Sequence, residues 1–216
     1  MLSIVAGLQQ ATFGGVVIDG TEIREPGLDR GVVFQSPSLL PWMSAYENVL
    51  LAAREAHPQS SAAQHEELVM RYLSLVGVDE FARQMPSELS QGTQQRVAIA
   101  RALSLEPRFL LLDEPFGMLD SMTRFELQDL VMELWEKDQR TVLLVTHDID
   151  EALYLSDRII LMTDGPEARV GVDLAVTLPR PRGRRMATEN PDYLRLRNDV
   201  IRFLEHHSKQ FAEKAA

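Results

Sequence analysis

Short apolar runs, each followed at once by polar residues, recur along the chain and predict buried parallel strands. They occupy residues 30–35, 109–115, 141–146 and 158–163. Continuous apolar runs of this length are typical of a parallel sheet covered by helices on both faces. In the second run four apolar residues lead directly to Asp113 and Glu114, so the strand would deliver two carboxylates to the carboxyl edge of the sheet. Taken alone, an ordinary core strand that meets a polar loop explains this run equally well.

Helical spacing and capping residues predict several helices between and around these strands. Ser44 and Glu47 form a capping box that opens a helix to about Arg54. Apolar residues at helical spacing then lead to Gly77, and Ser90 is placed as the N-cap of a long helix. We read residues 41 to about 105 as a mostly helical lobe set into an α/β body. Further expected elements are a short helix over 1–8, a turn, strand and turn over 14–20, a short helix near 80–84 and an amphipathic helix near 193–207.

Composition is that of a water-soluble globular protein and narrows the function classes. Of 216 residues, 45% are hydrophobic, 25% are charged and none is cysteine, which excludes disulfides and thiolate metal sites. No segment approaches the roughly 18 apolar residues of a membrane helix, and the first eight residues lack the basic leader of a secretory signal. The net charge of −10 argues against broad nucleic-acid binding. The basic cluster at 180–185 could touch phosphate or anionic lipid, or could simply be a solvated loop.

Four motifs follow one another in the middle of the chain. They are Leu89-Ser90-Gln91-Gly92-Thr93, the strand 109–115, Gly117-Met118-Leu119-Asp120 and Thr146-His147-Asp148. In this order and spacing they resemble the ATPase subunit of ABC transporters, with its signature loop, Walker B strand, D-loop and switch histidine. The resemblance implies an α/β fold with a P-loop NTPase-like core and an inserted helical lobe. It also implies ATP and Mg²⁺ as ligands.

The resemblance gives each polar residue of the strand ends a role. Asp113 would bind Mg²⁺ and Glu114 would act as the general base on the attacking water. Gln35, which ends the first strand, would reach Mg²⁺ and the same water. His147 would hydrogen-bond the γ-phosphate, although a lone histidine after a strand is more often structural. Asp120 would cross a dimer interface, and it is also placed to cap the helix that begins at residue 121.

The signature loop would contact ATP that is held by the opposite subunit of a homo- or heterodimer. Ser90 and Gly92 keep the hydroxyl and one glycine of the usual pattern, L-S-G-G-Q. Gln91 and Thr93 depart from that pattern, which puts the strength of phosphate contact in doubt. Without the resemblance, the same residues read as a plain capped helix.

The loop from Gln35 to Met43 would bind the membrane permease, because it combines leucines and Trp42 with a proline. This loop and the tail resemble the nitrate, sulfonate and taurine importer branch. Nitrate is the first expectation for the substrate, with sulfonates, taurine or cyanate as alternatives. The branch implies a periplasmic or surface substrate-binding protein as an indirect partner, no nucleic acid, and a peripheral place on the cytoplasmic face of the inner membrane.

The phosphate-binding pattern G-x-x-x-x-G-K-[ST] does not occur in the sequence. We therefore expect an N-terminally shortened ATPase domain over 1–165, followed by a tail over 166–216, and we expect this polypeptide alone to hydrolyse ATP poorly or not at all. One alternative is a degenerate, non-catalytic subunit that lends its signature loop to an intact partner; the DNA upstream of Met1 would distinguish the two. Another is a soluble ATPase of the same superfamily in DNA repair or translation.

Overall fold

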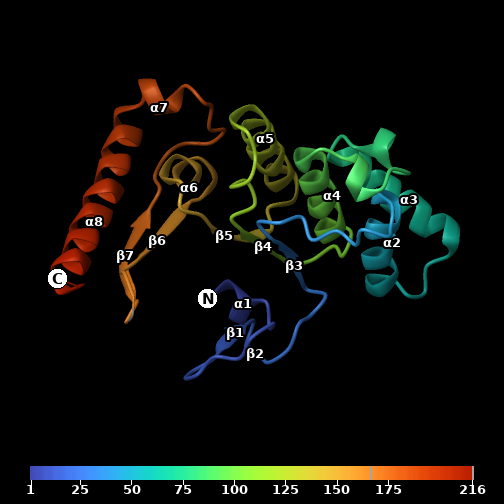
Figure 1. The fold of residues 1–216 in the computed structure, drawn as a ribbon, viewed down its shortest axis with the longest axis horizontal. Helices are drawn as coiled ribbons and strands as arrows, with labels where there is room; N and C mark the ends of the chain where they lie inside the picture. The colour runs from blue at the N-terminus through green and yellow to red at the C-terminus, as the bar shows by residue number, and fades with distance from the viewer. Residues whose placement is uncertain (166, 216) are drawn as a thin grey trace. The chain divides into compact units, whose positions relative to one another are not determined.

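The computed structural model describes residues 1–165 and 167–215, with side chains up to residue 206. The chain forms two compact units, Met1–Val145 and Thr146–Ala216 (Figure 1). The sequence predicts different limits, namely an ATPase domain with a helical lobe, followed by a tail. Those domain limits remain predictions. Over the described residues, every helix is too short or too polar to cross a membrane.

The first unit is built on a parallel sheet of β3 (Arg30–Val33), β4 (Phe109–Asp113) and β5 (Thr141–Val145), in that order. Its strands coincide with three of the predicted apolar runs. Val33 pairs with Leu112, and Asp113 pairs with Val145. Leu110, Leu111 and Leu112 are buried, so β4 is the central strand of this core. The register places the ends of β3 and β4 side by side.

The N-terminal segment folds beside this sheet. Helix α1 (Leu2–Val5) packs Leu2 and Ala6 against Leu111 of β4. It is followed by a hairpin of β1 (Val16–Ile18) and β2 (Thr21–Ile23). Asp19 and Gly20 both have positive φ at its two-residue turn, as right-handed hairpin twist favours. The sequence predicted the first strand and the turn, but not β2.

Helices α2 (Ala45–Ala56), α3 (Ala62–Leu75) and α4 (Gln91–Leu103) pack against one another (Figure 1). The short helices η1 (Asp79–Phe81) and η2 (Pro86–Glu88) lie between α3 and α4. The predicted capping box is present, since Glu47 N donates to Ser44 Oγ and Ser44 N donates to Glu47 Oε2. Ser61 and Gln64 form a second box that the sequence reading missed. Between β4 and β5 runs α5 (Ser121–Asp138), whose Leu127 is completely buried.

The second unit contains α6 (Ile149–Leu155), β6 (Arg158–Met162), β7 (Val170–Ala175), α7 (Met186–Glu189) and α8 (Pro191–Ala215). Strands β6 and β7 form an antiparallel hairpin, of which only β6 was predicted. Leu153, Ile159, Tyr193 and Val200 belong to one buried cluster that joins α6, β6 and α8. Helix α8 covers the amphipathic segment predicted near 193–207 and is longer at both ends.

Two arginines of the basic cluster have a structural role. Arg182 is 5% exposed, and its Nη1 donates to the carbonyl oxygens of Leu153, Tyr154 and Ser156 at 3.1, 3.2 and 2.6 Å. Arg180 donates to the Leu155 carbonyl. Cations suit the carbonyl end of a helix, so both side chains cap the C-terminus of α6. Neither a phosphate site nor a solvated loop describes this arrangement.

Candidate functional site

Gln35 and Glu114 meet at the carboxyl edge of the parallel sheet. Each lies two residues beyond the paired residues Val33 and Leu112, so the register of β3 and β4 brings them together. Gln35 Nε2 donates a hydrogen bond to Glu114 Oε2 at 3.1 Å. This is the edge at which parallel α/β sheets bind ligands. Two of the residues proposed for water activation are therefore in direct contact.

The backbone of Glu114 is strained at this point. Its φ is +45°, in the left-handed region that residues other than glycine rarely adopt. Its N–H donates to the Val145 carbonyl at 2.9 Å, and its own carbonyl accepts from Gly117 N at 3.1 Å. A Cβ at Gly117 would lie 3.4 Å from Gln35 Nε2 and 3.7 Å from Glu114 Oε2. Strain of this kind concentrates at functional sites, and no pattern in the sequence indicates it.

Asp113 ends β4 as a half-buried residue beside this pair. No group of three or more histidine or acidic side chains that could hold a metal occurs in the described ranges. The single carboxylate of Asp113 fits Mg²⁺, which binds proteins through one or two carboxylates and takes its other ligands from water and phosphate oxygens. Because the amide nitrogen of Gln35 donates its hydrogen bond to Glu114, the amide oxygen is left as a second oxygen ligand for Mg²⁺. Asp113 and Gln35 therefore suit Mg²⁺, and their role as its ligands stays a prediction.

The signature loop forms the N-terminus of α4. Ser90 is exposed and caps the helix, since Thr93 N donates to Ser90 Oγ at 3.1 Å. The Thr93 hydroxyl lies 2.8 Å from the same oxygen, so this departure from the family pattern holds Ser90 in place. Gln91 points to solvent, whereas Gly92 is buried, and a Cβ there would lie 2.5 Å from Thr123 Cγ2 of α5. Gly92 thus permits close packing of α4 on α5; its contact with ATP remains a prediction.

Asp120 caps α5, as the sequence predicted. Its Oδ1 accepts hydrogen bonds from Met122 N and Thr123 N, each at 3.1 Å. Hydrogen bonds from the side chain and backbone of Thr123, with that from Met122, lower the pKa of the Asp120 carboxyl. The charge is therefore favoured at the helix N-terminus. A role across a dimer interface stays a prediction.

His147 belongs to the second compact unit, in the turn before α6, and is exposed. Asp148 N donates to Thr146 Oγ1 at 3.0 Å, and the Asp148 carboxylate caps α6 by accepting from Glu151 N at 3.0 Å. The turn is therefore anchored on both sides of the histidine. The sequence reading included Asp148 in the motif but missed its capping role. The proposed meeting of His147 with the two carboxylates stays a prediction.

Hydrogen bonds between side chains of α2 and α4 and backbone groups fix the loop from Gln35 to Met43. Buried Asn48 accepts from Leu40 N at 2.8 Å and donates to the Leu40 and Met43 carbonyls at 3.2 and 2.9 Å. Arg101 Nη1 donates to the Ser38 carbonyl at 2.9 Å. Trp42 is 68% exposed, whereas Leu39 and Leu40 are partly buried, so Trp42 is the most exposed of these three apolar side chains. The sequence reading missed Asn48 and Arg101, because their partners are backbone carbonyls that only the fold brings near.

Comparisons with known proteins agree with this geometry. The family described as "ABC transporter" matches residues 1–117. The nitrate import ATP-binding protein NrtD of Synechococcus elongatus is 50% identical over 204 residues, which cover 94% of this chain and 74% of that protein. The bicarbonate transport ATP-binding protein CmpD of the same species is 48% identical, covering 94% and 73%.

A solved structure shares the fold. It is the dimeric post-hydrolysis state of the ATP-binding cassette MJ0796 bound to ADP and Pi. The TM-score is 0.71 and the sequence identity 34%, over 84% of this chain and 79% of that one. Its family match, its close relatives and its fold all agree: the chain belongs to the ABC transporter family, as an ATP-binding cassette with a P-loop NTPase-like core.

Proposed function

We propose that this chain is the ATP-hydrolysing subunit that energises an importer of a small anion, with nitrate as the substrate. The contact of Gln35 with Glu114 at the carboxyl edge of the sheet is the observation that carries the hydrolytic part. The identity of 50% to a nitrate import ATP-binding protein supports the substrate. Bicarbonate is the second candidate, because a bicarbonate transport relative is 48% identical.

The residues at the sheet edge have separate roles in ATP hydrolysis. Glu114 accepts the proton of the attacking water, and the hydrogen bond from Gln35 orients its carboxylate for that task. Asp113 and the Gln35 amide oxygen would hold Mg²⁺, which when bound neutralises charge on the phosphates. His147 would complete the site by donating to the γ-phosphate. Substitution of Glu114 should therefore cost more activity than substitution of any neighbour.

A second subunit completes the arrangement. Ser90 and Gly92, at the N-terminus of α4, would contact ATP held by the opposite subunit, where free N–H groups favour an anion. The dimer of MJ0796 supports a paired assembly. Trp42 would seat in a permease at the cytoplasmic face of the inner membrane. A substrate-binding protein outside that membrane would deliver the anion.

The chain contains no G-x-x-x-x-G-K-[ST], so its contribution is best tested in a mixed dimer. The partner is an intact cassette of the nitrate type whose own signature serine has been replaced, co-expressed with nitrate permease subunits. We expect this chain to restore uptake of isotope-labelled nitrate, and Ser90→Ala to abolish the restoration. Restored uptake only when bicarbonate permease subunits replace the nitrate ones would favour the second candidate, and no restored uptake with either permease would refute the proposal.

A further inference from the structure

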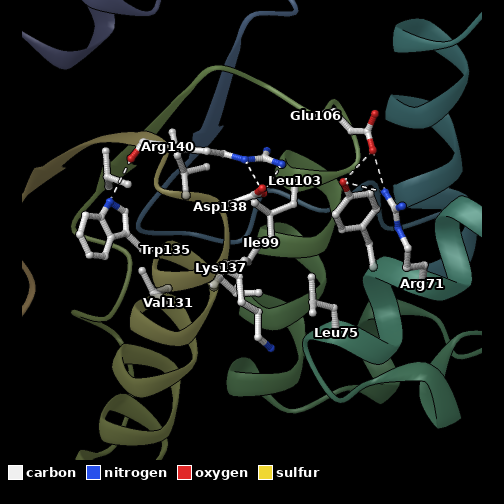
Figure 2. Close-up of a pocket in the computed structure, with 14 residues that line it drawn as sticks. Arg71, Leu75, Ile99, Leu103, Glu106, Val131, Trp135, Lys137, Asp138 and Arg140 are labelled. Atoms are coloured by element: carbon white, nitrogen blue, oxygen red, sulfur yellow. Dashed lines mark hydrogen bonds and ion pairs between the residues drawn. The ribbon is translucent and has the colours of Figure 1, made fainter. Parts of the chain in front are cut away.

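A pocket lies in the first unit where α3, α4 and α5 meet the starts of β4 and β5. Its volume is about 360 Å³, within the range of about 300–1,000 Å³ that is common for small-molecule sites. Its walls are mainly aliphatic, and Figure 2 shows Ile99 and Leu103 from α4 opposite Val131 from α5. Residues of the proposed nucleotide site do not line it. The pocket is therefore separate from the proposed nucleotide site.

Two aromatic side chains in the wall are fixed by hydrogen bonds. Trp135 Nε1 donates to the Arg140 carbonyl at 3.0 Å, and Tyr72 OH donates to Glu106 Oε1 at 3.1 Å. Their polar atoms are thus occupied within the protein, and their rings remain as apolar surfaces. A site of this kind is preformed, which lowers the entropic cost of binding an apolar molecule.

Two of the three cationic side chains at the pocket rim are paired with a carboxylate, and the third, Lys137, is not, among the residues whose side chains are described. Arg71 pairs with Glu106 at 2.7 Å, and Arg140 Nε donates to Asp138 Oδ2 at 2.8 Å (Figure 2). Lys137 also lines the pocket and has no charged partner among the residues whose side chains are described. The carbonyl end of α5 offsets it only weakly, because helix-end effects are partial and screened at a surface. The rim therefore favours one negative charge.

We propose that this pocket binds a small aliphatic monocarboxylate, such as a medium-chain fatty acid. Its chain would lie between Tyr72 and Trp135, and its carboxylate would pair with Lys137. The occupant would contact α3, α4 and α5 together. Because Ser90 and Asp120 cap the opposite ends of α4 and α5, occupancy would stiffen the two helices that present them. This site is additional to the proposed nucleotide site and does not depend on it.

Trp135 offers a direct readout, because the chain has only two tryptophans. In a Trp42→Phe background of the 216-residue chain, decanoate should change Trp135 emission saturably and raise the melting temperature. Decanol has the ten-carbon alkyl chain without the negative charge, and butyrate has the negative charge with only a short alkyl chain. Both should bind more weakly than decanoate. No saturable change with decanoate, or equal binding of decanol, would overturn the proposal.

Two variants separate the contributions. Lys137→Gln should weaken decanoate binding by about twofold to fivefold, the range expected for one exposed ion pair, whereas the matched control Arg54→Gln, on exposed α2 surface, should leave it unchanged. Leu75→Phe narrows the pocket and should weaken binding by about tenfold. If Leu75→Phe does not fold, Lys137→Gln decides. Unchanged affinity in Lys137→Gln, or an equal loss in Arg54→Gln, would contradict the proposed pairing.

Discussion

The two ends of β4 differ in a way that separates chemistry from packing. At its carboxyl end, Asp113 and Glu114 remain partly exposed, and Glu114 has a strained backbone. At its amino end, Leu110 faces an apolar pocket whose carboxylates are each paired with an arginine. Both ends belong to one strand. The described arginine–carboxylate pairs of the pocket thus lie at the amino end, whereas the carboxyl end brings the Glu114 carboxylate against the Gln35 amide.

The largest expected effect falls on the carboxyl end. In a chain to which a phosphate-binding segment of the family pattern has been joined before Met1, Glu114→Gln should slow ATP hydrolysis by about 10²- to 10⁴-fold, because the general base is lost. Steady-state phosphate release measures this rate. The unmodified 216-residue chain is the control, and it should hydrolyse ATP poorly or not at all. A loss below about threefold would show that Glu114 is not the base.

Two leucines in different environments test the packing of the first unit, one fully buried in α5 and one that lines the pocket. Leu127 is completely buried, and Leu127→Ala should lower the free energy of unfolding by about 2–5 kcal/mol. Leu75 already faces the pocket and is partly exposed, so Leu75→Ala should cost clearly less. Urea denaturation of both variants provides the comparison. Equal losses would show that the pocket is collapsed in solution.

Two helix caps sharpen the functional contrast. Ser90→Ala and Ser61→Ala each remove an N-cap and should each cost about 0.5–2 kcal/mol of stability. Only Ser90→Ala should also abolish ATP hydrolysis in the mixed dimer with a cassette whose own signature serine has been replaced. Thermal unfolding and phosphate release, measured on the same samples, separate the two effects. A comparable loss of hydrolysis in Ser61→Ala would mean that general destabilisation, not Ser90, explains the result.

The smallest effect concerns acid stability at the pocket rim. Burial alone would raise the pKa of Glu106, but hydrogen bonds from Arg71 and Tyr72 and the charge of Arg71 outweigh it and lower that pKa. A lowered pKa gives stabilisation that is present above the ordinary value and is lost as the pH falls through the folded-state value. In Glu106→Gln the free energy of unfolding should therefore fall less steeply as the pH is lowered. The difference from the unsubstituted chain should be below about 1 kcal/mol, since the ion pair is exposed. An unaltered pH profile would argue against this ion pair in solution.

Sequence reasoning succeeded where a local pattern determines the structure. Apolar runs predicted β3, β4 and β5, and the Ser44–Glu47 box predicted the start of α2. It failed where tertiary contacts decide: β2 and β7 are short strands that depend on their partners. Arg182 looked like a surface cation, yet three carbonyl groups of another segment surround it.

The candidate site shows the same division. Gln35 and Glu114 could be proposed because each follows a predicted strand and because the order of the motifs resembles that of ABC transporter ATPases. The left-handed backbone of Glu114 and the support of the 35–43 loop by Asn48 and Arg101 could not, since neither leaves a periodic signal in the sequence. The hydrogen bond of Thr93 to Ser90 could not be predicted either, because a residue that departs from a family pattern does not reveal which contact it makes.

We propose that Glu114 and His147 act on one nucleotide. The most direct test is a double-mutant cycle of ATP hydrolysis in the chain joined to the phosphate-binding segment, with Glu114→Gln, His147→Ala and both together. Residues that act as a unit are strongly non-additive, so the double variant should be within about twofold of the slower single variant. Independent effects that multiply in the double variant would contradict the claim.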